Sequence, residues 1–158
     1  MTTPLAETTP PATLRTGHVG LNVTDLERST AFYTRLLGLT VRAEGKEDDR
    51  RWALLGRDER LVVTLWQQSG EPFSPSTAGL HHLSFEVGSI DEVTAAEAVL
   101  RELGAAFVHD GVVAHGEGGA SGGIFFTDPD GIRLEIYAPT GAEGAPAPSG
   151  AAPTCGFF

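Results

Sequence analysis

Two stretches of the chain alternate strictly between polar and apolar residues, and each begins with a histidine. One runs from His18 to Val23 and the other from His82 to Val87. Because strand side chains point alternately to opposite faces, both stretches predict strands with an apolar back and a polar front. A capping-box signal for a helix follows each strand, over residues 24–27 and 89–92. The repetition predicts two similar units.

The same order of elements is expected in both units: one strand, one helix and three more strands. In residues 14–67, the pattern predicts strands at 14–23, 39–42, 51–55 and 60–67, a helix at 25–37 and a charged loop at 44–51. In residues 79–138, it predicts a helix at 90–103 and strands at 80–87, 105–109, 124–126 and 132–137. Gly38 and Gly104 should end the helices, since glycine adopts the left-handed conformation without a Cβ penalty. Residues 68–78 have the composition of a linker.

The two ends of the chain differ in composition from its middle. Residues 1–13 form a Thr/Pro-rich leader that we expect to be flexible, and residues 139–158 form a tail rich in Ala, Gly and Pro. We expect the tail to be disordered, because it has little apolar surface to bury. Its last four residues, Cys155 to Phe158, leave open that the two phenylalanines dock on a surface or a partner.

Composition and charge narrow the function classes. A net charge of -10 argues against a nucleic-acid partner, which would favour a basic face. The single cysteine excludes an internal disulfide. The sequence has no apolar run of membrane-spanning length and no secretion signal at its start. We therefore expect a cytoplasmic protein with no membrane partner.

The polar fronts of the strands are expected to line one concave cleft. The side chains that this cleft would collect are His18, Asn22, Thr64, Trp66, His82, Ser84, Glu86, Glu135 and Tyr137. Two imidazoles and one carboxylate from separate strands suit a divalent transition metal, and this ligand set is associated with non-haem Fe(II). A buried Glu135 without a metal or a base would be costly. The metal prediction requires His18, His82 and Glu135 to meet at one ion.

Residues 14–138 resemble the vicinal oxygen chelate superfamily, which includes glyoxalase I, fosfomycin-resistance proteins, bleomycin-binding proteins and extradiol dioxygenases. The stretches that carry the resemblance are 17–27, Phe32-Tyr33, Leu37-Gly38-Leu39, Gly79 to Leu83 and Asp128 to Tyr137. The resemblance implies an α+β fold, in which two βαβββ repeats form an open, incomplete barrel around a metal-binding cleft. It also implies that His18, His82 and Glu135 are the metal ligands.

The resemblance favours one branch of the superfamily over the others. Glyoxalase I and methylmalonyl-CoA epimerase carry a fourth ligand, Glu or Gln, at the position where this chain has Thr64, which is a poor ligand and no general base. An Fe(II) extradiol-type dioxygenase acting on a catechol-like substrate is therefore expected, with Mn(II), Ni(II) or Zn(II) as other metals. His115 is the candidate acid-base residue, with His109 as the alternative, and Tyr137 is a second catalytic candidate.

The remaining expectations concern the substrate and partners. Trp66, Phe126 and Tyr137 could wall an aromatic ring, and Thr64, Asn22 and Ser84 could contact the substrate. The alternatives are a non-catalytic protein that binds an aromatic compound, and a lyase or transferase like glyoxalase or the fosfomycin enzymes. A homodimer is expected. The sequence leaves open whether one chain completes the cleft or two chains exchange units.

Overall fold

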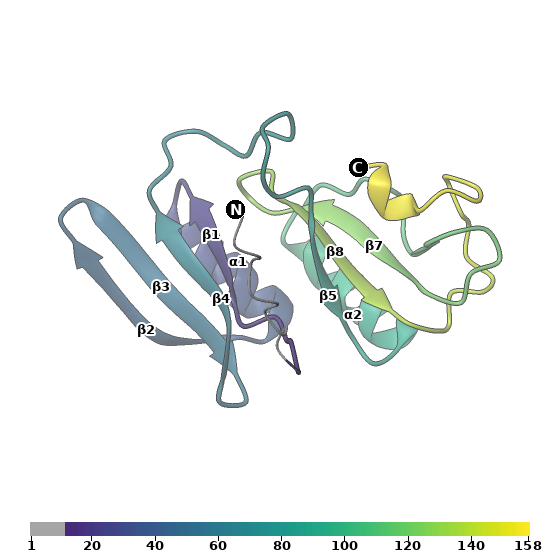
Figure 1. Cartoon of the computed structure of the whole chain (residues 1–158), viewed down its shortest axis with the longest axis horizontal. Helices are drawn as coiled ribbons and strands as arrows, with labels where there is room; N and C mark the ends of the chain where they lie inside the picture. The colour runs from purple at the N-terminus through teal and green to yellow at the C-terminus, as the bar shows by residue number, and fades with distance from the viewer. Residues whose placement is uncertain (1–11) are drawn as a thin grey trace, which may run out of the picture.

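Two four-stranded sheets, each with one helix behind it, make up the fold (Figure 1). The structure, a computed structural model, describes residues 12–158, so most of the leader predicted at 1–13 lies outside it. The strand orders are β1-β4-β3-β2 and β5-β8-β7-β6, and neither sheet closes into a barrel. The predicted α+β class with two open βαβββ repeats is confirmed.

The two units have the same topology. The first contains β1 (Val19–Val23), α1 (Leu26–Leu37), β2 (Thr40–Glu47), β3 (Arg50–Arg57) and β4 (Arg60–Gln67). The second contains β5 (Leu83–Glu86), α2 (Ile90–Glu102), β6 (Val113–Ala114), β7 (Gly122–Thr127) and β8 (Arg133–Ala138), and the 3-10 turn η1 (Thr154–Gly156) follows. In each unit the first strand pairs in parallel with the last, and the other pairs are antiparallel.

Two predicted segments differ from the structure. The charged loop expected at 44–51 is a continuation of β2 and β3 around a two-residue turn. Because β2 is an outer strand with nearly all its side chains exposed, charges are tolerated along it. The strand expected at 105–109 is reduced to one isolated bridge between Phe107 and Phe126, and the outer strand β6 lies further along the chain.

The helix ends follow the expected signals with one exception. Gly38 ends α1 in the left-handed conformation, at a φ of 61°. The Ser89 side chain accepts a hydrogen bond from the Glu92 amide at the start of α2. In α1, however, the N-cap is Asp25 rather than the predicted Thr24. The Thr24 amide and hydroxyl instead donate hydrogen bonds to the Asp130 carboxylate in the second unit.

The core lies between the apolar backs of the sheets and the two helices, and it is continuous across both units. Its fully buried side chains include Val23, Tyr33, Leu55, Leu65, Leu100, Ile124, Phe126 and Leu134. Since the backs are covered, the polar fronts face away from the helices. Within residues 12–158, no helix is both long and apolar enough to cross a membrane.

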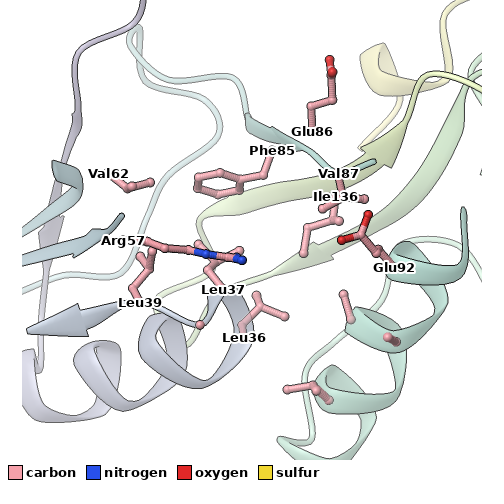
Figure 2. Close-up of a pocket in the computed structure, with 14 residues that line it drawn as sticks. Leu36, Leu37, Leu39, Arg57, Val62, Phe85, Glu86, Val87, Glu92 and Ile136 are labelled. Atoms are coloured by element: carbon pink, nitrogen blue, oxygen red, sulfur yellow. The ribbon is translucent and has the colours of Figure 1, made fainter. Parts of the chain in front are cut away.

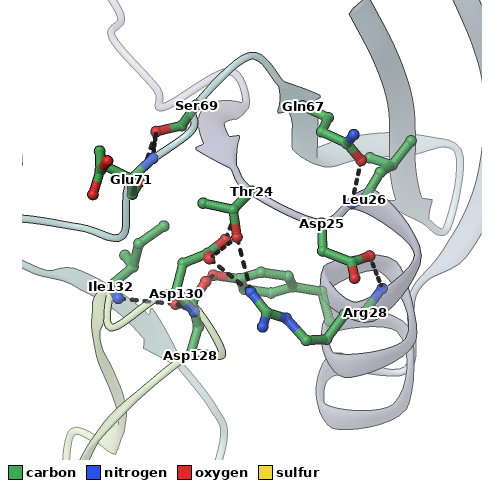
Figure 3. A network of polar contacts seen from close by, with 11 residues as sticks. Thr24, Asp25, Leu26, Arg28, Gln67, Ser69, Glu71, Asp128, Asp130 and Ile132 are labelled. Atoms are coloured by element: carbon green, nitrogen blue, oxygen red, sulfur yellow. Dashed lines mark hydrogen bonds and ion pairs between the residues drawn. The ribbon is translucent and has the colours of Figure 1, made fainter.

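The tight turn between β7 and β8 forms a polar joint between the units (Figure 3). Asp130 accepts a hydrogen bond from the Thr24 amide at 2.9 Å and pairs with Arg28 at 2.7 Å. The Tyr33 hydroxyl donates to Asp128 Oδ2 at 2.8 Å, and both groups are buried. Burial, followed by the charge of Asp128, raises the pKa of Tyr33 well above its usual value. The joint therefore fixes α1 against the second unit.

The segment 139–158, which the sequence predicts to be disordered, is docked on the second unit (Figure 1). The Ala114 amide donates to the Pro146 carbonyl at 2.8 Å, and the Glu117 amide donates to the Gly150 carbonyl at 2.8 Å. Thr154 is fully buried, and its hydroxyl donates to the Ala114 carbonyl at 2.7 Å. The composition argument fails because hydrogen bonds to residues 114–120, which require no bulky apolar side chains, hold residues 142–154.

Candidate metal centre

His82 and Glu135 face each other on the front of the second sheet. His82 directly precedes β5, and Glu135 lies in the middle of β8, where it is paired with Ser84 on one side and Phe125 on the other. His82 Nε2 lies 3.7 Å from Glu135 Oε2. This distance is too long for a hydrogen bond, although both atoms are potential metal ligands. Glu135 is only 3% exposed, so its carboxylate needs a positive or donating partner.

His81 fixes the orientation of the His82 ring. The Nδ1 atoms of the two histidines lie 2.8 Å apart, so one of them donates a hydrogen bond to the other. When His82 Nδ1 is the donor, its Nε2 lone pair points toward Glu135. Metal-binding histidines characteristically donate their second ring N–H to an outer partner in this way. Burial lowers the pKa of His82, against the opposing charge of Glu135, and the neutral ring is the form that binds metals.

His115 approaches the other oxygen of the same carboxylate. Its Nε2 donates to Glu135 Oε1, and its Nδ1 lies 2.8 Å from Ser121 Oγ. In the neutral ring Nδ1 is an acceptor, so the Ser121 hydroxyl donates to it. His115 is therefore engaged at both nitrogens, and the structure brings it together with two of the three predicted ligands.

The third predicted ligand is not in this cluster. His18 is exposed at the head of β1 in the first sheet. Within residues 12–158, no three His, Cys, Asp or Glu side chains are placed so that they could hold a metal ion. Within one chain, His18 therefore does not join His82 and Glu135, and the ligand set of these three residues stays a prediction. The alternative that two chains complete the cleft stays a prediction.

The other front residues of the first sheet are engaged with one another. Thr64 is 2% exposed, and its hydroxyl accepts a hydrogen bond from Trp66 Nε1 at 3.0 Å. The Asn22 side chain accepts one from the Gln68 amide at 3.0 Å. The Trp66 side chain is 38% exposed, and its ring centroid lies 6.3 Å from that of Trp52. None of these contacts reaches His82 or Glu135.

Two predicted residues of the second unit also have other surroundings. Phe126 is fully buried in the core, because it pairs with Leu134 on the back of the sheet, so its assignment to the substrate wall is wrong. Tyr137 is on the front, where its ring centroid lies 5.3 Å from that of His115, but its hydroxyl donates to Glu86 at 2.5 Å. That hydrogen bond is the main cause that raises the pKa of Tyr137. Ser84 is exposed beside Glu135, as expected.

The aromatic ring that does line the front is Phe125, which sequence reasoning missed. Phe125 is paired with Glu135, and its ring lies 6.1 Å from that of His115. A signal was available, because the turn 128–131 fixes the register of the hairpin and puts Phe125 opposite Glu135. His81 was missed because the strand predicted at 80–87 puts it on the opposite face from His82, whereas in the structure both histidines precede β5. Ser121 was missed because it lies just before β7, where no periodicity assigns a face.

Two hollows of the structure are lined by neither His82, His115 nor Glu135. One, of about 420 Å³, lies between the end of α1, α2 and β5. Its lining is mostly apolar, with Phe85 among aliphatic side chains, and also includes Arg57, Glu86 and Glu92 (Figure 2). The other, of about 600 Å³, has Val19 on one side and Ser84 on the other. Because neither hollow includes the facing pair of His82 and Glu135, the chemistry of that pair identifies the site better than cavity volume does.

Comparison with known families shows to which superfamily the chain belongs. A profile of the Glyoxalase/Bleomycin resistance protein/Dioxygenase superfamily matches residues 15–136. The chain belongs to this superfamily. The match covers both sheets, both helices and the residues of the His82–Glu135 cluster.

The relatives of this chain within the superfamily are named for different activities. The chain is 31% identical over 124 residues to catechol-2,3-dioxygenase of Bacillus subtilis, covering 77% of this chain but only 40% of that protein. It is 29% identical over 124 residues to the glutathione transferase FosA of Serratia marcescens, covering 76% of this chain and 77% of that protein. These two relatives are named for different reactions, so the family assignment does not fix the activity.

Solved structures agree on the fold. A glyoxylase/bleomycin resistance protein/dioxygenase domain from Frankia superposes with a TM-score of 0.70 at 28% identity, over 80% of this chain and 93% of that one. The fosfomycin-resistance protein FosX of Listeria monocytogenes, solved with Mn(II) and sulfate, superposes with a TM-score of 0.60 at 20% identity, over 85% of this chain and 98% of that one.

The donors of this superfamily member are compatible with a divalent metal. Ligand atoms lie about 2.1 Å from a bound first-row metal ion, so one ion can bridge two donors up to about 4.2 Å apart. The 3.7 Å between His82 Nε2 and Glu135 Oε2 is within that limit. Imidazole and carboxylate together suit Fe, Mn, Ni or Zn. The pair therefore fits half of a metal site, and further ligands must come from outside the cluster.

Proposed function

We propose that this chain is a metal-dependent enzyme of its superfamily, an Fe(II) extradiol-type dioxygenase that acts on a catechol-like substrate. His82 and Glu135 of one copy, with His18 of a second copy, would hold the metal. The observation that carries the proposal is the 3.7 Å gap between a buried carboxylate oxygen and an imidazole nitrogen that do not hydrogen-bond to each other. The similarity to catechol-2,3-dioxygenase supports the substrate class.

The second copy supplies what the cluster lacks. His18 is exposed, and it begins an outer strand whose sheet has an open front. That front also exposes Trp66, a large aromatic side chain of the kind that marks interfaces. Laying this front over the second sheet of another copy would bring His18 to His82 and Glu135. A two-fold dimer makes the exchange reciprocal, so it would create two equal sites.

The protein's own groups have separate tasks in this proposal. A bound Fe(II) ion supplies the open positions at which a substrate with two adjacent oxygens and O₂ are held together. His115 is a positioning residue, because its Nε2 donates to Glu135 and its Nδ1 is held by Ser121. Both contacts orient the carboxylate, which leaves Oε2 free for the metal. His81 plays the same role for the His82 ring.

The first experiment measures metal content and oxygen uptake. The protein is purified without oxygen, loaded with Fe(II), and supplied with a panel of catechols. We expect uptake by the wild type and loss of more than about 100-fold in His82→Ala, in line with the removal of a metal ligand. Glu86→Gln is the matched control, because Glu86 is an exposed carboxylate on the same front whose hydrogen-bond partner is Tyr137 rather than His82 or Glu135. No uptake by the wild type, or equal uptake by His82→Ala, would refute the proposal.

A complementation experiment tests the exchange between copies. His18→Ala and His82→Ala are each expected to be inactive. After the two variants are unfolded and refolded together, each mixed dimer has one site with all three ligands and one with His82 and His18 both replaced. Random pairing therefore restores about a quarter of the wild-type activity. A site built within one chain would give no restored activity.

The second candidate function is non-catalytic binding of an aromatic compound. It is favoured by the presence of only two of the three ligands in one chain. Tight binding of a catechol by metal-free protein, with no oxygen uptake after Fe(II) loading, would support this candidate. A transferase like FosA, to which the chain is also similar, would instead join the sulfur of glutathione to an electrophilic second substrate and consume both.

A further inference from the structure

An aromatic ring of the chain itself lies over the candidate site. The ring of Phe158 is stacked on that of His82, with centroids 5.4 Å apart and planes at 27°. It meets Phe125 edge-on at 5.4 Å and His81 edge-on at 6.2 Å. The guanidinium carbon of Arg133 lies 5.6 Å from its centroid, within reach of a cation–π contact. Four side chains thus surround one ring beside the metal donors.

The segment that carries this ring is anchored immediately before it. The Thr154 amide donates to the His115 carbonyl at 2.9 Å, and the Thr154 hydroxyl donates to the Ala114 carbonyl at 2.7 Å. These bonds place η1 along β6, on the side that β7 leaves open. Phe157 is 57% exposed, so only one of the two adjacent phenylalanines is used at the site.

The surroundings of Phe158 select a chemical class of ligand. The face of His82 and the edges of Phe125 and His81 favour a flat aromatic ring. Arg133 is the cation at this position, so it favours an electron-rich ring or one with an anionic substituent. A ring held there is stacked on His82, and its substituents would be directed at the gap between His82 and Glu135. A phenolic ring with adjacent oxygens meets all of these conditions.

We infer that His81, His82, Phe125 and Arg133 form a ring-binding subsite, which Phe158 occupies until an aromatic ligand displaces it. The inference rests on the proposed function for the identity of the ligand, and it adds an intramolecular competitor to the site. A ligand that must displace Phe158 binds with an affinity reduced by the fraction of molecules in which the subsite is open. One aromatic pair is worth about 0.5–1.5 kcal/mol, which converts to about two- to twelvefold, so removing the Phe158 ring should tighten binding by at least that range.

The test compares Phe158→Ala with Phe157→Ala, which removes the same side chain from the exposed neighbouring position. The first readout is the proton NMR spectrum of the His82 ring in metal-free protein. A ring stacked on His82 shifts its signals upfield, so they should move in Phe158→Ala and stay in place in Phe157→Ala. A His82→Gln variant assigns the signals among the five histidines.

The second readout is the binding of 4-nitrocatechol, followed by its absorbance, in the same metal-free variants. We expect the dissociation constant to fall about two- to twelvefold or more in Phe158→Ala relative to the wild type and Phe157→Ala. Unchanged or weaker binding in Phe158→Ala would overturn the inference, since Phe158 would then be absent from the site or a permanent wall of it. The inference would also be overturned if the His82 ring signals had the same chemical shifts in Phe158→Ala and Phe157→Ala.

Failure of the proposed function gives a different result. In that case Fe(II)-loaded protein consumes no oxygen with any catechol, in the wild type or in Phe158→Ala. The metal-free NMR and 4-nitrocatechol readouts do not depend on turnover, so they would still show the displacement of Phe158.

Discussion

Replacing Tyr33 with phenylalanine removes one hydroxyl group from the joint between the two units. That hydroxyl donates to Asp128 Oδ2 at 2.8 Å, and both residues are at most 5% exposed. The other oxygen of Asp128 accepts from the amides of Asp130 and Ile132 at 2.8 and 2.9 Å. The substitution therefore leaves one oxygen of a buried carboxylate without its partner (Figure 3).

The expected loss of stability follows from that geometry. A hydrogen bond to a charged group contributes about 1.5–3 kcal/mol, and an unpaired buried acceptor also loses its hydration. We expect Tyr33→Phe to lower the free energy of unfolding by about 2–3 kcal/mol at pH 7. This is a large share of the roughly 5–15 kcal/mol that is typical of a domain.

The pH dependence provides a sharper criterion. Burial and the charge of Asp128 raise the pKa of Tyr33 in the folded protein. A raised pKa contributes stability that is fully present below the unfolded value, near pH 10, and is lost as pH rises toward the folded value. Stability of the wild type should therefore fall by about 1.4 kcal/mol per pH unit above pH 10 because of this group. The free energy of unfolding of Tyr33→Phe should lack this part of the decrease with pH.

The measurement is urea unfolding at pH 7, 9, 10 and 11, on the wild type and two variants. Tyr137→Phe is the matched control, because Tyr137 is the only other tyrosine and its hydroxyl meets Glu86 near the surface. We expect little change in stability for this control. The reasoning is refuted if Tyr33→Phe has the same slope above pH 10 as the wild type, or if both variants lose equal stability at pH 7.

Two further substitutions test the packing around the site. A Cβ at Gly123 would lie 2.2 Å from the Ile136 carbonyl oxygen, so Gly123→Ala should destabilise the protein by more than about 2 kcal/mol in urea unfolding, whereas Gly144→Ala, with nothing within 4 Å, should be neutral. Thr154→Val keeps the buried shape but loses the hydrogen bond to Ala114, so hydrogen exchange of residues 150–158 should speed up roughly fivefold, for a loss of about 1 kcal/mol, while the exposed Thr140→Val should leave it unchanged. Equal effects within either pair would contradict these assignments.

The repeat and its elements could be predicted because periodicity and glycine caps are local signals. His82 and Glu135 could be placed together because they lie on strands whose fronts are polar. His18 shows the limit of this reasoning, since a pattern assigns a residue to a face of its own sheet but does not say how two sheets are placed. Thr24 shows another limit, because its hydroxyl bonds to Asp130, 106 residues away in sequence, and Asp25 caps the helix in its place.

The C-terminal segment could not be predicted from composition for a related reason. Its order depends on carbonyl and amide groups of residues 146–154 that meet the outer strand β6, and backbone groups leave no trace in the choice of side chains. Only Phe157 and Phe158 were distinctive, and their sequence cannot say which of the two is buried. Contacts of this type are visible only once β6 itself has been placed.

The register of the second sheet ties the site to the core. Ser84, Glu135 and Phe125 form one row across β5, β8 and β7, and the row beside it contains Leu134 and Phe126. Side chains alternate along each strand, so a slip of one residue would exchange these rows and move Glu135 into the core. The burial of Leu134 and Phe126 thus fixes the position of the carboxylate. Selection for a stable core and for a working site therefore acts on the same pairing of strands.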